Sequence, residues 1–263
     1  MKTGSRQQPA TLSRMYLLVI FWVYAMCSLA DVAGAPLDPA LLHWSRVLET
    51  YVNEQGQVDF QGLTNNPAEL QAYVDYIATI SPESDPAAFP GTASRIAYFI
   101  NSYNALSMYN VLDSGIPETL GGWRKIPFFV LKRFTIGGDK MSLYSYENNV
   151  IRAQGEERVH FALNCMVAGC PRLPRTPFTG ADLDAQLERE ARHFFSEARN
   201  FHIDPEHKVV YLSWIMKHYR EDFLARAPSL VDYVNKYVED RIPSDYTVKY
   251  LPYDWTVNIQ HRE

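Results

Sequence analysis

The sequence has few cysteines and no excess of positive charge. Three cysteines in 263 residues exclude a disulfide-dense mini-protein, and 47% hydrophobic with 21% charged residues excludes a disordered chain. Twenty-five lysine and arginine residues stand against 30 aspartate and glutamate residues, which gives a net charge of −5. Neutralised phosphates supply most of the affinity for nucleic acid, so an acidic chain has no general attraction for nucleic acid or anionic lipid. We therefore predict no nucleic-acid partner.

Common catalytic motifs are also missing. The chain has no glycine-rich phosphate loop, no Gly-x-Ser-x-Gly elbow, no His-Glu-x-x-His and no Cys-x-x-Cys. These absences leave the sequence without a motif for nucleotide binding, serine hydrolysis or metalloprotease chemistry. No cofactor and no metal ion are predicted.

A short apolar run near the amino terminus predicts export. Residues 15–30 (MYLLVIFWVYAMCSLA) follow three basic residues and are too few for the roughly twenty that a membrane-spanning helix needs. Ser28 and Ala30 place small residues at −3 and −1, which predicts cleavage before Asp31. The expectation is a signal peptide over residues 1–30 and a periplasmic or secreted chain with no stable membrane span after cleavage. An uncleaved anchor and lipidation at Cys27 are the alternatives.

Hydrophobic periodicity predicts helices mixed with short strands. Residues 94–113 are apolar over more than half of the helical circumference, which predicts a central buried helix. Apolar and polar residues alternate over 159–165, which predicts a strand packed against that helix. Because helices and strands do not alternate regularly, the fold class is α+β: a single domain over 31–263 with helices around a small, mainly antiparallel sheet. The other predicted elements are helices over 41–52, from Pro67, over 143–152, after Asp182, after Ser213 and near 230–238, a hairpin over 128–143, and strands over 209–212 and 248–251.

Polar residues inside otherwise apolar segments mark a candidate site. Burying a polar group without a partner is costly, so such residues either clamp the backbone or face a shared cleft. Asn101 and Asn104 lie three residues apart on the central helix and therefore share a face. The candidate catalytic residues are Cys165, His160, Glu147 and Asp254, and the candidate binding residues are Asn101, Asn104, Arg158 and Asn258.

The pair Cys165 and Cys170 allows three interpretations. In an oxidising compartment, two cysteines separated by a short loop first indicate a disulfide. Alternatively, His160 activates one of them as a thiolate nucleophile, although five residues of regular strand would point His160 and Cys165 to opposite faces. A zinc site formed by these three residues and a carboxylate is the third interpretation, with looser spacing than structural zinc sites use.

Blocks of residues along the chain resemble those of a known domain family. The main blocks are Ala97-Tyr98-Phe99-Ile100-Asn101-Ser102-Tyr103-Asn104-Ala105-Leu106, Arg158-x-His160-Phe161-Ala162-Leu163-x-Cys165, Cys170-Pro171-x-Leu173, Tyr219-x-x-Asp222-Phe223 and Tyr253-Asp254-Trp255-x-x-Asn258. With them the sequence resembles the DUF547 domain, whose name records an undetermined function. Asn148, Gly169 and His218 stand where the family often has histidine, serine and tryptophan. The resemblance implies an exported or soluble domain and supplies no established reaction.

Two functions follow from these residues. The first is an exported DUF547-like binding or accessory module for an unknown small molecule or peptide, stabilised by a Cys165–Cys170 bridge. The alternative is a thiol-dependent hydrolase or acyltransferase that uses a cysteine–histidine site on an amide or thioester bond.

Overall fold

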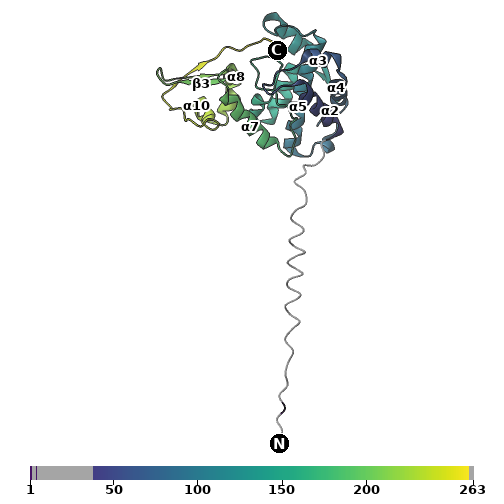
Figure 1. Cartoon of the computed structure of the whole chain (residues 1–263), viewed down its shortest axis with the longest axis horizontal. Coiled ribbons are helices and arrows are strands. Elements are labelled where there is room, and N and C mark those ends of the chain that lie inside the picture. Colours follow the sequence, from purple (N-terminus) through teal and green to yellow (C-terminus); the bar gives the residue numbers. More distant parts are fainter. Residues whose placement is uncertain (2–3, 5–37, 261–263) are drawn as a thin grey trace. The chain divides into compact units, whose positions relative to one another are not determined.

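The longest helix, α5 (Gly91–Asp113), forms the centre of the packing, as the sequence predicts (Figure 1). The structure is a computed structural model that describes residues 1, 4 and 38–260. Nearly every residue of α5 from Ile96 to Val111 is buried. The helix ends because Gly115 adopts a left-handed conformation (φ +74°), which a glycine tolerates and which stops helical continuation.

Three helices pack before α5 in the chain: α2 (Pro39–Tyr51), α3 (Phe60–Asn65) and α4 (Ala68–Thr79). Asp38 caps α2 by accepting a hydrogen bond from the Ala40 amide at 2.8 Å. Trp44 on α2 stacks on Tyr73 of α4, with ring centroids 5.8 Å apart. The predicted helices over 41–52 and from Pro67 are confirmed. The loop that follows contains one short 3-10 turn, η1 (Pro86–Ala88).

The predicted hairpin begins later than the sequence suggests. After a 3-10 turn, η2 (Gly122–Arg124), the residues from 128 that were expected to start a strand belong instead to a π-helical segment, η3 (Ile126–Leu131). Pro127 lies in the first turn of η3, where its missing N–H is not needed, and Asn110 of α5 donates to the Phe128 carbonyl. The hairpin itself consists of β1 (Phe134–Ile136) and β2 (Asp139–Met141).

The turn of this hairpin provides a stability prediction. Gly137 and Gly138 both have positive φ, but a Cβ on Gly137 would lie 2.7 Å from the Cβ of Ser81, whereas one on Gly138 would meet open space. We expect Gly138→Ala to cost about 1–2 kcal/mol for the left-handed backbone alone. Gly137→Ala should cost about 1–3 kcal/mol more because of the added overlap. Urea unfolding measures both, and equal losses would contradict the packing of Ser81 on this turn.

The predicted helix over 143–152 is confirmed as three consecutive turns. They are α6 (Leu143–Tyr146), capped by Ser142, η4 (Glu147–Ile151) and η5 (Arg152–Gln154). The predicted strand over 159–165 is wrong. Residues 157–161 form a 3-10 helix, η6 (Glu157–Phe161), and the chain then turns through Met166 at φ +68°. Alternation misleads here because the polar residues His160 and Asn164 are buried as fully as their apolar neighbours.

The rest of the chain places a three-stranded sheet beside short helices. α7 (Leu183–Ser196) begins where Thr179 accepts a hydrogen bond from the Asp182 amide, as predicted. In the sheet, β4 (Val209–Leu212) lies between β3 (Phe201–Asp204), which pairs antiparallel, and β5 (Thr247–Tyr250), which pairs parallel. The remaining helices are α8 (Trp214–His218), α9 (Arg220–Leu224) and α10 (Leu230–Val234). With its two small sheets, the fold is mixed α+β, as predicted.

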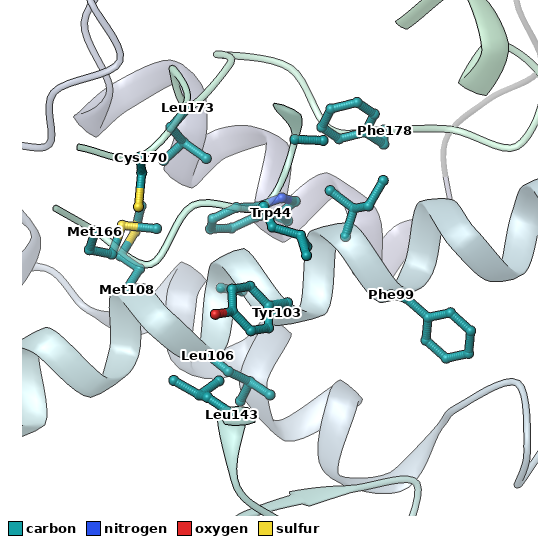
Figure 2. Close-up of a cluster of buried hydrophobic side chains, with 14 of the residues drawn as sticks. Trp44, Phe99, Tyr103, Leu106, Met108, Leu143, Met166, Cys170, Leu173 and Phe178 are labelled. Carbon is teal, nitrogen blue, oxygen red and sulfur yellow. The ribbon is translucent and has the colours of Figure 1, made fainter. Parts of the chain in front are cut away.

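Buried side chains gather in two clusters. The first joins α2, α4 and α5 to the cysteine segment, and Figure 2 shows part of it. The second joins α7, β4 and α8–α10 around Phe161, which has no exposed surface. Both clusters belong to the unit that begins at Asp38. Within residues 38–260, no helix is long and apolar enough to cross a membrane. The predicted signal peptide lies outside the described residues, apart from residues 1 and 4.

Candidate functional site

A cavity of about 360 Å³ opens where the two clusters meet. We call it the thiol cavity, because Cys165 and Cys170 form part of its wall. Aromatic side chains dominate the lining, with a few polar groups among them, which is typical of small-molecule sites. The residues that line the cavity include Tyr103, Lys125, Ile126, Phe129, Val130, Tyr144, Glu147, His160, Cys165, Cys170, Trp214, His218, Tyr219, Tyr253 and Trp255.

The two cysteine sulfurs and a tyrosine hydroxyl form a compact cluster in this wall. The Sγ atoms of Cys165 and Cys170 are 2.9 Å apart, and the Tyr253 hydroxyl lies 3.2 Å from the Cys170 sulfur. The Cys165 amide also donates to the Cys170 sulfur at 3.1 Å. Cys170 is 3% exposed, whereas Cys165 is only partly buried. Cys165 is therefore the more accessible thiol, and Cys170 the one that receives hydrogen bonds.

This arrangement separates the acidities of the two thiols. Burial opposes ionisation of Cys170, but hydrogen bonds from Cys165, Tyr253 and the backbone outweigh it and lower the pKa of Cys170. Donation to Cys170, together with burial, raises the pKa of Cys165 well above its usual value. The two shifts favour the arrangement in which Cys165 keeps its proton and donates it toward the Cys170 sulfur. A titration would follow the pair rather than either cysteine alone.

The backbone brings Tyr253 to the sulfurs. After β5, the chain runs beside the cysteine loop, where the amides of Ala168 and Gly169 donate to the carbonyls of Thr256 and Asp254 at 2.8 Å. A Cβ on Gly169 would lie 2.8 Å from the Asp254 carbonyl oxygen, so the close approach uses the missing side chain. The glycine at this position therefore allows the closing segment to place Tyr253 over Cys170.

His160 belongs to a hydrogen-bonded group behind the cavity wall. Its Nε2 lies 2.8 Å from Oδ2 of Asp222, and Arg152 holds both oxygens of the same carboxylate at 2.8 and 2.9 Å. The hydrogen bond from His160 lowers the pKa of Asp222; burial opposes this shift and Arg152 adds to it. The His160 ring stacks on Tyr219 at 3.7 Å between centroids, and its side chain is 1% exposed. His160 is thus fixed in place, and it makes no hydrogen bond to either cysteine.

Glu147 lies on the same wall between two phenols. Tyr103 donates to Oε2 of Glu147 at 2.9 Å, and Tyr219 donates to Oε1. Burial, reinforced by this carboxylate, raises the pKa of both tyrosines well above the usual value, so both keep their protons. At the rim, His218 stacks on Trp214 with centroids 4.3 Å apart. Desolvation lowers the pKa of His218, so its imidazole is neutral at pH 7.

One comparison with known proteins identifies part of this chain. Residues 89–195 match the family model described as "Protein of unknown function, DUF547". Over this segment the chain is similar to the DUF547 domain. No curated protein and no solved structure matches the chain. The family match extends from just before α5 to the last turn of α7, so it includes Glu147, His160 and both cavity cysteines.

The structure brings together only some of the predicted site residues. Glu147, His160, Cys165 and Cys170 line one cavity, as expected of a shared site. Asn101 and Asn104 instead clamp backbone, each bonding both an amide and a carbonyl, so the backbone alternative holds for them. The other predicted residues do not line the thiol cavity: Arg158 pairs with Glu156 and Asp184, Asp254 is exposed and accepts from the Thr256 amide, and Asn258 donates to the Gly56 carbonyl.

Three residues of the site were not among the candidates that the sequence predicts. Asp222, rather than the candidate carboxylates Asp254 and Glu147, bonds His160. Tyr253, rather than His160, contacts the Cys170 sulfur. Both stand in the blocks that resemble the DUF547 domain, which is the signal that could have found them. His218, which carries no partner pattern in the sequence and looks incidental, lines the cavity.

The predicted disulfide is not formed. A disulfide bond measures about 2.03–2.05 Å between sulfurs. The observed 2.9 Å leaves both cysteines as free thiols in contact. The arrangement of the zinc alternative is also not found: within residues 38–260, no group of three or more His, Cys, Asp or Glu side chains is arranged to hold a metal ion.

Proposed function

We propose that the thiol cavity is the active site of a thiol-dependent hydrolase or acyltransferase acting on an amide or thioester bond. One observation carries the proposal: the sulfur of a partly exposed cysteine, Cys165, lies 2.9 Å from a second sulfur, that of Cys170, whose pKa is lowered. A nucleophilic thiol needs a group that takes its proton as it attacks. In this chain the second sulfur, rather than an imidazole, occupies that position.

The first half of the reaction follows from the sulfur pair. The Cys165 sulfur attacks the carbonyl carbon of the substrate, and its proton moves to Cys170 across the 2.9 Å contact. A sulfur–carbon bond forms, and the bond from the carbonyl carbon to the leaving amine or thiol breaks. Cys170 returns the proton to the leaving group. The product of this half-reaction is a thioester on Cys165.

The second half needs a base that can reach the cavity. The His160 side chain is almost sealed and bound to Asp222, so we assign it a positioning role for Tyr219 and the wall. His218 is neutral at pH 7, lines the cavity and can accept a proton from an incoming water or amine. The incoming oxygen or nitrogen bonds to the carbonyl carbon and the sulfur–carbon bond breaks. The proton that His218 took then passes to the cysteine pair, which restores the starting state. Water gives hydrolysis and an amine gives acyl transfer.

The lining favours a substrate with an apolar or aromatic acyl group. Phe129, Trp214 and Trp255 supply flat apolar surface, and Lys125 lies over Trp255 at 3.7 Å. A small molecule or a peptide side chain is the size of partner that such a cavity accepts. We further propose that the protein works outside the cytoplasm, on the evidence of residues 1–30 alone. A binding module without chemistry is the second function that the same cavity supports.

Covalent labelling tests the proposal. We expect iodoacetamide at pH 7 to modify Cys165 of the native full chain faster than it modifies the same cysteine after denaturation. Although the pKa of Cys165 itself is raised, its rate should rise with the first proton loss of the pair, because the pKa of Cys170 is lowered and Cys170 can then take the proton of Cys165 as it attacks. An activated ester, p-nitrophenyl acetate, should leave an acetyl group on Cys165 and release nitrophenolate. Site mapping by mass spectrometry separates this product from modification of Cys27.

Two results would decide against enzymatic acyl transfer. One is a native Cys165 that reacts no faster than in the denatured chain. The other is nitrophenolate release without any acetyl group on either cavity cysteine. Either result would leave the binding module as the better account of the cavity.

A further inference from the structure

Exposed apolar side chains gather at the mouth of the thiol cavity. Of the seven large hydrophobic residues that are exposed in the described part of the chain, five lie between positions 123 and 144. Trp123 and Leu131 are the most exposed of the five, at 70% and 65%. Scattered exposed apolar residues are ordinary, but a group of them on one surface marks an interaction site.

These five residues come from three neighbouring elements. Trp123 belongs to η2, Ile126, Val130 and Leu131 to η3, and Tyr144 to α6. η3 packs against both η2 and α6, so the five exposed residues come from adjoining parts of the surface. Ile126, Val130 and Tyr144 also line the thiol cavity, which therefore opens at this surface.

The same segment is basic in an otherwise acidic protein. Residues 119–138 contain Arg124, Lys125, Lys132 and Arg133 and no aspartate or glutamate, while the whole chain carries a net charge of −5. Arg124 and Arg133 are exposed and form no salt bridge with another residue of the described part of the chain. Lys132 pairs with Asp113, and Lys125 lies over the Trp255 ring. We call the five apolar residues and these four cations the apolar–basic patch.

We propose that the apolar–basic patch docks on a lipid surface that carries anionic headgroups. Aromatic and aliphatic side chains flanked by lysine and arginine are the combination that holds a protein at a membrane interface. Each cation near an anionic surface contributes about 1 kcal/mol, which corresponds to about a fivefold gain in affinity. The general repulsion expected from the net charge does not apply here, because the patch presents a local excess of positive charge.

The positive charge of the patch also favours a lipid surface, rather than a second copy of the chain, as its partner. A symmetric dimer through the patch would bring the same cations of both copies together, because an isologous interface uses one surface twice. An anionic membrane instead offers negatively charged headgroups for the cations and an apolar acyl region beneath them for the hydrophobic side chains. Docked in this way, the thiol cavity opens toward the lipid. The proposal concerns where the protein sits and does not depend on the thiol chemistry.

Hydrogen exchange of the full chain on vesicles tests the docking locally. Local protection is the readout because the apolar residues 15–30 of the same chain can bind lipid by themselves. We expect residues 122–133 to gain protection on vesicles of equal parts phosphatidylcholine and phosphatidylglycerol. Phosphatidylcholine alone should give much less, and 1 M salt, where the screening length is about 3 Å, should reduce the difference.

Paired variants separate the two parts of the patch. Trp123→Ser with Leu131→Ser should lower the vesicle affinity of the patch by more than about tenfold. Arg124→Gln with Arg133→Gln should lower it by about thirtyfold on the anionic vesicles only. Leu42→Ser and Arg241→Gln, which lie outside the patch, are the matched controls and should change nothing. None of these six residues contributes to the proposed thiol chemistry, so iodoacetamide labelling of Cys165 should persist in all variants.

Three outcomes would overturn the docking proposal. The first is the absence of protection on either vesicle. The second is equal protection in the wild type and the Trp123→Ser, Leu131→Ser variant. The third is protection without lipid that rises with protein concentration, which would assign the patch to self-association.

Discussion

Cys165→Ser is expected to eliminate acylation of the native protein, whereas Cys170→Ser is expected to slow it by about 10²–10⁴-fold. The first substitution removes the accessible sulfur, and the remaining Cys170 is 3% exposed. The second keeps the nucleophile but removes the acceptor of its proton, and loss of a general base typically costs this factor. Rates of acetylation by p-nitrophenyl acetate, with the modified site mapped by mass spectrometry, measure both effects.

The pH dependence distinguishes the roles of the two sulfurs. In the wild type the pair loses its first proton at a pH below the usual thiol range, because hydrogen bonds lower the pKa of Cys170. In Cys170→Ser, the reaction of Cys165 should move to higher pH, since no thiolate remains to accept its proton. Cys27→Ser is the control and should leave the rate and the pH profile unchanged. Equal rates for Cys165→Ser and wild type would rule out Cys165 as the nucleophile.

The central helix shows what local sequence can predict. Apolar residues around most of its circumference require burial on all sides, and Gly115 fixes its end, so α5 follows from its own sequence. The segment 159–165 shows the limit. Its alternating pattern is a local property, whereas its conformation depends on partners such as Asp222 and Asn104, about sixty residues away in either direction. Those partners allow His160 and Asn164 to be buried. The segment therefore has no solvent-exposed polar face, which the alternating pattern of a half-buried strand implies.

The candidate site also contains some residues that local sequence predicts and others that it does not. Glu147, His160 and Cys165 are detectable because each is a polar residue within an apolar segment, and the structure places them on one cavity wall. Asp222 and His218 lie on short helices beside other charged or exposed residues, where no local feature separates them from the surface. The opposite error occurs at Asp254, which follows a strand but remains in solvent. A polar residue within an apolar segment thus predicts a buried polar group. Its hydrogen-bond partner depends on the fold and cannot be predicted from the segment.

Asp222→Ala is expected to destabilise the protein by about 2–3 kcal/mol at pH 7. Asp222 binds both His160, which is buried, and Arg152. Breaking a fully buried pair costs about 3–5 kcal/mol, and the smaller figure applies because the Asp222 side chain is 26% exposed. For a chain of this size the melting temperature should fall by about 4–12 °C. Because Tyr219 stacks on His160, labelling of Cys165 should also become slower as the wall loosens.

The stabilisation that Asp222 provides should decrease at low pH. Its pKa is lowered in the folded state, chiefly by the His160 hydrogen bond, so its stabilisation is complete above the unfolded pKa of about 3.9. That contribution is lost as the pH falls through the lower folded pKa. The gap between wild type and Asp222→Asn, measured by urea unfolding, should therefore narrow below pH 4. Asp245→Asn removes an exposed pair with Lys208, 2.7 Å long, and should leave the stability nearly unchanged at any pH, because solvent screens the pair. If Asp222→Asn behaved like this control at pH 7, Asp222 would not be the residue that holds His160 in the cavity wall.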